Sequence, residues 1–392
     1  MKIVIAPDSF KGSLTSQEAA DTIAKSFLKI FPQAEIEKIP LSDGGEGTTQ
    51  ILINATKGKI YSEFVTSPIG EKINTNYGIL GDRKTAVIEM AAASGLSLVP
   101  IEKRNPLFTT TFGTGELIKA ALNKGCRKFI IGMGDSATTD AGAGLAQALG
   151  VKLLTEENQE IPLGGIGLKK LQRIDISNID KRILESEITV ACDVNNPLTG
   201  PSGTASVYSV QKGASKDDVK KLELYLINFA EVVKRDLGKE IQSVPHSGAA
   251  GGLAAGLLAF FDAQLKSGFE VVSNILNFPE RIKDADLVIT GEGKIDAQTL
   301  KGKTPIEVAK IAGENNIPVI AIAGIIGDGA DKCLKAGIEA IFSLTSKKTG
   351  TEKTLEKAKL LLAGVSEDIA KKFKKGMLFG VDVTQSILIV KK

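Results

Sequence analysis

Residues 2–31 read KIVIAPDSFKGSLTSQEAADTIAKSFLKIF, and this stretch sets the expected fold. The apolar run KIVIA, rich in β-branched residues and followed by a loop, is typical of a buried strand. Thr15 and Glu18 form a capping box, and apolar residues then recur at helical spacing, which predicts a helix. A second strand near 35–39 and a helix near 48–55 follow. This βαβα order is typical of a parallel sheet covered by helices.

The pattern changes after Lys59. Three alternating segments predict an antiparallel meander, at 60–66, 73–80 and 85–90. Mixed elements follow, with helices near 115–123, 141–149 and 216–236 and strands near 128–132 and 188–192. From Asp286 the alternation of strands and helices returns, and it continues to an amphipathic helix near 353–374.

We therefore predict an α/β protein of two domains. Residues 1–59 plus 286–392 form a discontinuous parallel-sheet domain from both chain ends, and residues 60–285 form a second α/β domain inserted into it. Insertions are tolerated at surface loops, and we expect a cleft between the two domains. The segment 377–392 fits either a strand or a tail.

The composition is that of an ordinary globular protein. Of 392 residues, 43% are hydrophobic and 24% charged. The formal net charge is +3, and the sequence contains no Trp. So little positive charge, with few aromatic stacking platforms, argues against a nucleic acid partner. The three cysteines contain no CxxC pair, which favours a reducing compartment. No apolar run is long enough for a signal segment or a membrane span, so we expect a cytoplasmic protein.

Carboxylates follow four of the predicted strands. Each acid alone is more often a helix cap or a turn residue. Together they suit Mg²⁺ binding and the deprotonation of an alcohol, because the ends of parallel strands meet at one edge of a sheet. The polar residues at these strand ends are Asp8, Ser9, Lys11, Asp43, Glu46, Asp193, Asn195, Asn196, Glu292, Lys294 and Asp296.

Three loops rich in Gly, Ser and Thr lead directly into predicted helices, at 109–115, 132–144 and 247–252. Such helix starts favour phosphate or carboxylate, although tight turns with close packing explain each loop equally well. The stretch at 297–304 nearly matches a P-loop but has Ala where the first Gly belongs, so we expect Thr304 to be the N-cap of a helix. His246, the only histidine, is expected to be a solvent-facing loop residue rather than a general base.

Seven motifs occur in order between residue 3 and about residue 345: APDSFKGSLTSQEAA, LSDGGEGT, RNP with TTTFGTGELI, GDSATTDAGAGLAQALG, CDVNNPLTGP, QKGA and ITGEGKIDAQTLKGKTP. Together they resemble the bacterial type-1 glycerate kinase family. The resemblance implies ATP-dependent phosphorylation of D-glycerate, usually at the 2-hydroxyl, to give 2-phosphoglycerate. It also implies a flavodoxin-like domain built from both chain ends and a distinct inserted α/β domain.

The chain departs from the family's pattern at several positions. Where the family commonly reads GGSATNDGG, this chain has Asp135, Thr139 and Ala141, so the backbone lacks two glycines. Lys294 replaces a frequent Arg and loses its bidentate geometry toward a carboxylate. The family's GPQKGA reads SVQKGA here.

The resemblance and the motifs together give a set of expected ligand-binding residues. The nucleotide-binding set is Gly134, Ser136, Thr138, Gly142 and Glu292. The substrate-binding set is Arg104, Asp43 and Lys294. The guanidinium of Arg104 is expected to bind the glycerate carboxylate through two N–H groups.

The expected catalytic set is Asp193, Asp296, Lys11 and Asp8. Asp193 or Asp296 would take the hydroxyl proton, and Lys11 would offset charge on the transferred group. Two of Asp43, Asp193 and Asp296 would hold Mg²⁺.

Three alternatives stay open at this level. They are a glycerate 3-kinase, a kinase for another small hydroxy acid, and a non-catalytic sugar-acid or nucleotide sensor on the same fold. The oligomeric state cannot be read from the sequence.

Overall fold

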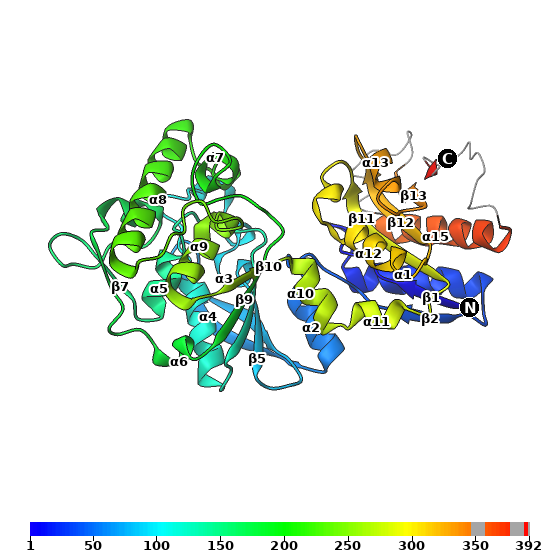
Figure 1. The fold of residues 1–392 in the computed structure, drawn as a ribbon, viewed down its shortest axis with the longest axis horizontal. Coiled ribbons are helices and arrows are strands. Elements are labelled where there is room, and N and C mark those ends of the chain that lie inside the picture. Colours follow the sequence, from blue (N-terminus) through cyan, green and yellow to red (C-terminus); the bar gives the residue numbers. More distant parts are fainter. Residues whose placement is uncertain (346–356, 377–387, 391–392) are drawn as a thin grey trace. The chain divides into compact units, whose positions relative to one another are not determined.

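The computed structural model describes residues 1–345, 357–376 and 388–390. The chain divides into two compact units (Figure 1). The terminal unit consists of Met1–Asp43 and Phe269–Lys392, and the inserted unit of Gly44–Gly268.

The terminal unit contains a six-stranded sheet in the order β14-β13-β12-β11-β1-β2. Five strands are parallel, and β14 pairs antiparallel with β13 at the edge. In chain order the parallel strands are arranged 2-1-3-4-5, which is the flavodoxin-like arrangement. The strands are β1 (Lys2–Ile5), β2 (Glu35–Lys38), β11 (Leu287–Ile295), β12 (Val319–Ile326), β13 (Ala340–Ser343) and β14 (Leu388–Val390).

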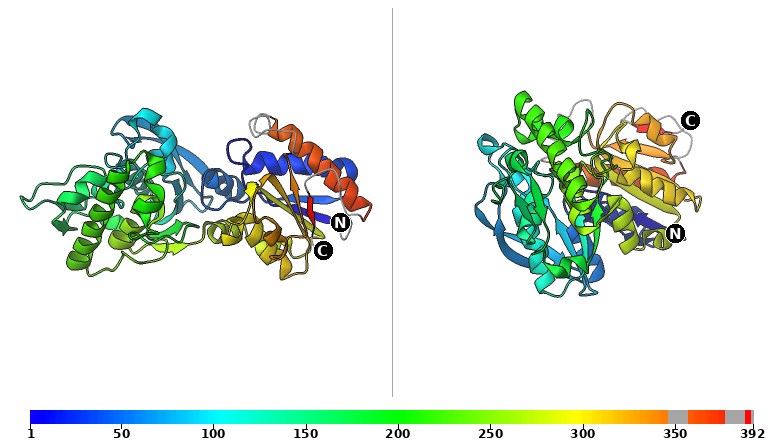
Figure 2. Two further views of the ribbon diagram at one scale, coloured as in Figure 1. Left: turned by 90° about the horizontal axis from the view of Figure 1, so that it is seen from above. Right: turned by 60° about the vertical axis from the view of Figure 1, so that its left-hand side comes forward.

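Helices cover both faces of this sheet (Figure 2). On one face α1 (Ser16–Ile30) packs beside α15 (Ala358–Lys374), and Phe27 and Leu362 contribute to their common core. The predicted capping box of Thr15 and Glu18 is confirmed at the start of α1. The other helices of the unit are α10 (Gly268–Ile275), α11 (Phe278–Ile282), α12 (Thr304–Gly313), which packs on β11 and β12, and α13 (Asp331–Leu334).

The inserted unit has a mixed sheet in the order β10-β9-β6-β5-β4-β3. The predicted meander is confirmed, because β3, β4 and β5 pair antiparallel, whereas β5, β6, β9 and β10 pair parallel. The strands are β3 (Lys59–Thr66), β4 (Lys72–Ile79), β5 (Thr85–Glu89), β6 (Lys128–Gly132), β9 (Glu187–Ala191) and β10 (Gln264–Lys266), and a separate small hairpin is formed by β7 (Lys152–Leu154) and β8 (Arg173–Asp175).

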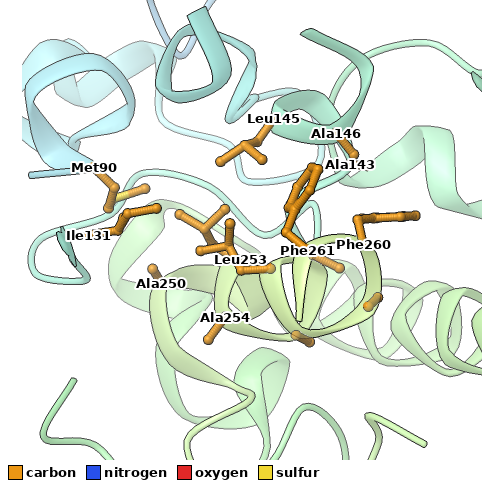
Figure 3. Packing of buried hydrophobic residues seen from close by; sticks show 14 of the residues in the cluster. Met90, Ile131, Ala143, Leu145, Ala146, Ala250, Leu253, Ala254, Phe260 and Phe261 are labelled. Carbon is orange, nitrogen blue, oxygen red and sulfur yellow. The ribbon is translucent and has the colours of Figure 1, made fainter. Parts of the chain in front are cut away.

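One large apolar core holds the helices of the inserted unit together. Figure 3 shows Leu253 and Phe261 of one helix facing Leu145, with Met90 and Ile131 beside them. The helices are α2 (Thr48–Thr56), α3 (Ala91–Ser94), α4 (Phe112–Asn123), α5 (Ala143–Ala148), α6 (Lys181–Leu184), α7 (Thr204–Tyr208), α8 (Lys216–Leu237) and α9 (Ala249–Phe261).

The junctions between the units come earlier in the chain than the sequence predicts, at 43/44 and 268/269 rather than 59/60 and 285/286. Side-chain contacts explain both shifts. Helix α2 belongs to the inserted unit because the Glu89 carboxylate of β5 accepts the N–H of Thr49 at 2.7 Å. Helix α11 belongs to the terminal unit because Arg281 pairs with Glu37 at 2.6 Å.

Two predictions fall partly outside the described residues. The helix expected near 353–374 is present as α15, whereas 353–356 lie outside the described ranges. Within 377–392 only β14 is described, and it is a strand. No helix of the described ranges is long and apolar enough to cross a membrane. The predicted α/β class with parallel sheets is confirmed.

Candidate functional site

Asp8 lies buried just after β1, where its carboxylate is anchored from a distant part of the chain. Its Oδ2 accepts the hydroxyl of Thr304 at 2.6 Å, and its Oδ1 accepts the N–H of Ser9 at 2.6 Å. The prediction that Thr304 caps α12 is therefore wrong. Lys303 occupies the N-cap position without a side-chain cap, and the hydroxyl of Thr304 binds Asp8 instead.

Glu292, near the end of β11, is the second buried acid of the terminal unit. It accepts the hydroxyl of Thr299 at 2.7 Å, and the amine of Lys303 lies 3.8 Å from its other oxygen. Burial raises the pKa of Glu292 to about 7, against the opposing effect of Lys303.

Asp8, Asp43 and Glu292 form a set of like charges, which we call the carboxylate cluster. Burial is the main cause that raises the pKa of Asp8, to about 8, and the negative charge of Asp43 raises it further. The charge of Asp43 also raises the pKa of Glu292. Because like charges disfavour each other's ionisation, this end of the sheet favours a bound cation or a proton.

Lys294 and Asp296 point to each other at the end of β11. The Lys294 amine lies 2.8 Å from Asp296 Oδ2, and this contact lowers the pKa of Asp296. The N–H of Gln298 donates to the other oxygen at 2.7 Å. The sequence assigns these two residues separate roles, whereas the structure makes them an ion pair.

Lys11 is exposed on the loop after β1, and glycine brings that loop close to β11. A Cβ built on Gly293 would lie 3.1 Å from the backbone nitrogen of Lys11. A larger residue at 293 would push the loop away. The absence of a side chain at Gly293 therefore helps to place Lys11 at the same end of the sheet as Glu292.

In the inserted unit, the Gly-rich loop (132–144) follows β6 and contains two non-glycine residues in left-handed backbone conformation. Asp135 has φ 52° and Ala141 has φ 51°. These are the positions where the resembled family has glycine. The backbone conformation that favours glycine is therefore kept without it, at a cost in strain. Backbone bonds hold the loop, since Asp135 accepts the N–H of Leu96 at 2.8 Å and Ala141 donates to Gly251 at 3.1 Å.

Asp140 anchors the Gly-rich loop from inside the protein. It is fully buried, and its carboxylate accepts the N–H and the hydroxyl of Thr111 at 2.8 and 2.9 Å. It also accepts the N–H groups of Gly142 and Gly144 at 3.2 and 3.3 Å. These contacts join the starts of α4 and α5. Burial raises the pKa of Asp140, and the four hydrogen bonds oppose that effect.

Lys212 is the residue that the sequence analysis missed. Its amine donates to the hydroxyl oxygen of Ser136 at 2.8 Å and to the carbonyl of Thr138 at 2.6 Å. The residue is 2% exposed, and burial lowers its pKa to about 7 although the charge of Asp140 raises it. The available signal was the QKGA motif, whose lysine carried no assigned role.

Arg104 is held beside the same loop. Its Nε donates to the carbonyl of Val99 at 3.2 Å, and an Nη2 donates to Leu96 at 3.4 Å. Leu96 in turn donates its N–H to Asp135, so the arginine and the Gly-rich loop share one backbone segment. The guanidinium is thereby oriented while it stays partly exposed.

Asp193 follows β9, and its Oδ1 accepts the hydroxyl of Ser267 and the N–H of Gly268, both at 2.9 Å. The histidine expected to face solvent is instead half-buried, with its Nδ1 lying 2.8 Å from the carbonyl of Val194. His246 thus supports the loop that carries Asp193, with Nδ1 as the donor, because a carbonyl can only accept.

The predicted site residues divide between the units. The terminal unit carries Asp8, Lys11, Asp43, Glu292, Lys294 and Asp296, and the inserted unit carries Arg104, Gly134, Ser136, Thr138, Gly142 and Asp193. Among the described residues, no three His, Cys, Asp or Glu side chains are arranged to hold a metal ion.

Known proteins match the chain over almost its whole length. The family model described as the glycerate kinase family matches residues 3–374. A glycerate kinase of Halalkalibacterium halodurans is 50% identical over 94% of this chain and 97% of its own length. A glycerate 2-kinase of Escherichia coli K12 is 52% identical over 88% and 90%. The crystal structure of a glycerate kinase 2 from Salmonella typhimurium LT2 is 46% identical, with TM-score 0.85, and the match covers 96% of this chain and 99% of that one.

Proposed function

This chain belongs to the glycerate kinase family, and we propose that it transfers the γ-phosphate of ATP to the 2-hydroxyl of D-glycerate, giving 2-phosphoglycerate. The observation that carries the proposal is the family match across residues 3–374. It is supported by relatives named glycerate kinase and glycerate 2-kinase, which are 50% and 52% identical to this chain. The 2-hydroxyl is supported by the relative named glycerate 2-kinase.

The Gly-rich loop supplies donors for the ATP phosphates. The N–H groups of Gly142 and Gly144 at the start of α5 are already bound by Asp140, so the proposed donors lie earlier in the loop, around Gly134 and Ser136, while Gly142 shapes the turn into the helix. Ser136 accepts a hydrogen bond from Lys212, so its own O–H is directed elsewhere and can donate to a phosphate oxygen. Thr138 completes this part of the nucleotide set, and Glu292 is its member in the terminal unit.

Arg104 binds the carboxylate of glycerate. Two of its donors are used by backbone carbonyls, which fixes the plane of the guanidinium. The remaining N–H groups suit a carboxylate, since the planar fork matches two acceptor oxygens. Asp43 and Lys294 complete the proposed substrate set.

The residues around the reacting groups act by position and charge, because phosphoryl transfer requires little covalent chemistry from the protein. Lys11 offsets negative charge on the transferred group, and Asp193 or Asp296 accepts the hydroxyl proton. The ion pair with Lys294 keeps Asp296 ionised and oriented. Asp8, anchored by Thr304, completes the proposed catalytic set, and because burial raises its pKa to about 8 its carboxyl holds a proton near neutral pH.

Mg²⁺ fits the residues of the proposed site. The like charges of the carboxylate cluster are a setting that a divalent cation stabilises, and carboxylate oxygens are the protein ligands it prefers. Two of Asp43, Asp193 and Asp296 would hold the ion, largely through water. When bound, Mg²⁺ neutralises charge on the phosphates.

The site of action that we propose is the cytoplasm. ATP is the co-substrate, and Cys126, Cys192 and Cys333 are buried and form no disulfide, as is usual in a reducing compartment.

An assay of the purified chain tests this function. ADP release should require ATP, Mg²⁺ and D-glycerate together, and NMR of the product should show the phosphate at carbon 2. ADP release at an equal rate without glycerate, or none with any of a panel of small hydroxy acids, would contradict the kinase. A sensor would bind its ligand without turnover.

A further inference from the structure

The amine of Lys212 is placed where a lysine is costly. Lysine is almost never fully buried unless it is paired, because its charged form loses hydration. Here 2% of the residue is exposed, and the amine contacts a hydroxyl and a carbonyl rather than a carboxylate. A methionine of similar length would fill the same space without that cost, so packing alone does not account for the amine.

Both hydrogen bonds of the amine end on the Gly-rich loop, at Ser136 and Thr138. The loop is bound from the other side by Asp140, whose carboxylate joins it to Thr111. Residues 136–140 are therefore held between an amine and a carboxylate, and Lys212 directly contacts Ser136 and Thr138, two of the residues proposed to bind phosphate.

Gly213, the residue after Lys212, lies against the backbone of Arg104, the arginine proposed to bind substrate. Its φ is 94°, in the region that favours glycine, and a Cβ built on it would lie 2.1 Å from the carbonyl oxygen of Arg104. The backbone of Arg104 can lie here only because position 213 has no side chain. One turn thus touches the nucleotide loop with Lys212 and the Arg104 segment with Gly213.

We propose that Lys212 is a positioning residue for phosphoryl transfer, which orients Ser136 and Thr138 toward the ATP phosphates and keeps the Gly-rich loop in register with Arg104. This inference rests on the proposed function of the site. The amine acts through the loop and not on the substrate, so its loss should impair ATP binding and turnover more than stability.

The main test compares Lys212→Met with wild type and with Lys221→Met, an exposed lysine of α8 that serves as the control. We expect Lys212→Met to raise KM for ATP and to lower kcat, each by about ten-fold or more, while the melting temperature stays equal or rises. The control should change none of these values. Wild-type values of KM and kcat in a folded Lys212→Met variant would overturn the proposal.

A pH series separates positioning from ordinary stabilisation. Asp140 is the charged group that acts on Lys212 among the described residues, and the pKa of Lys212 is about 7, below its ordinary 10.5. Between these values the unfolded chain binds more protons, so the lysine contributes a rise in wild-type stability with pH. The melting temperature of Lys212→Met, relative to wild type, should be highest near pH 6 and should decline toward pH 10. A variant less stable than wild type at every pH would indicate a structural role and overturn the proposal.

Ser136→Ala gives a second route that leaves the buried amine in place, should Lys212→Met fail to fold. It should raise KM for ATP, and the loss in the double variant should be smaller than the sum of the two single losses, because both changes break the contact between Lys212 and Ser136. If KM for ATP is unchanged in Ser136→Ala, or if the effects of a folded pair simply add, the proposal is wrong. Absence of glycerate kinase activity in the wild type would instead refute the proposed function.

Discussion

The two units differ in how their buried charged residues are arranged. In the terminal unit the carboxylate cluster brings together three acids, and burial, with a smaller effect of the Asp43 charge, raises the pKa values of Asp8 and Glu292. In the inserted unit the Gly-rich loop is held between one buried carboxylate, Asp140, and one buried amine, Lys212. The first arrangement groups several acids, with the amine of Lys303 beside Glu292, whereas the second sets one acid against one amine.

The two arrangements suit two different tasks of a kinase. A group of carboxylates suits a cation and the withdrawal of a proton from an alcohol. In the Gly-rich loop the N–H groups of Gly142 and Gly144 are bound by Asp140, so the proposed contacts with an anion fall to the residues around Ser136. The comparison can be tested by substitutions in each unit.

The largest effect is expected for Asp193→Asn and Asp296→Asn. Asparagine keeps the size and removes the negative charge, so kcat should fall by about 10²- to 10⁴-fold while folding is retained. Added Mg²⁺ should partly rescue the variant that lost a metal ligand and leave the other unchanged. Asp175→Asn, at the last residue of β8 and half-buried like Asp193 and Asp296, is the matched control and should keep full kcat. Near-normal kcat in both site variants would shift attention to Asp8 and Asp43.

An intermediate effect should distinguish two equivalent threonine contacts, one in each unit. Thr111→Val removes a donor to Asp140 and leaves the N–H of Leu145, which bonds to the same hydroxyl at 3.0 Å, without its acceptor. This should lower the free energy of unfolding by about 2–3 kcal/mol. Thr304→Val should cost about 1 kcal/mol, because Asp8 is already disfavoured as an anion by its neighbours. Urea denaturation measures both, and equal losses would mean that the charge surroundings do not matter.

The smallest effect concerns Asp135, where the chain departs from the resembled family. Its charge lies on the loop proposed to bind ATP, so Asp135→Asn should lower KM for ATP by about two- to five-fold, the size of a solvated charge interaction of up to about 1 kcal/mol. Asp135→Gly should lower KM equally and also stabilise the fold by about 1 kcal/mol, because φ is 52° there. An unchanged KM in both variants would show that the carboxylate points away from the nucleotide.

Much of the fold could be predicted from the sequence, because short sequence patterns determine local structure. The capping box at Thr15, the meander of β3 to β5 and the βα alternation after Asp286 each depend on residues close in the chain. The motifs likewise indicate the family from the sequence alone.

Only the tertiary structure decided which side chains meet. Thr304 bonds to Asp8 across 296 positions of the chain, and Lys212 to Ser136 across 76. No spacing or periodicity encodes such pairs, because they arise when separate strands and loops are brought to one end of a sheet. The same holds for charge: the pKa values of Glu292 and Lys212 both move to about 7 through burial, which is a property of the packed protein and not of either residue.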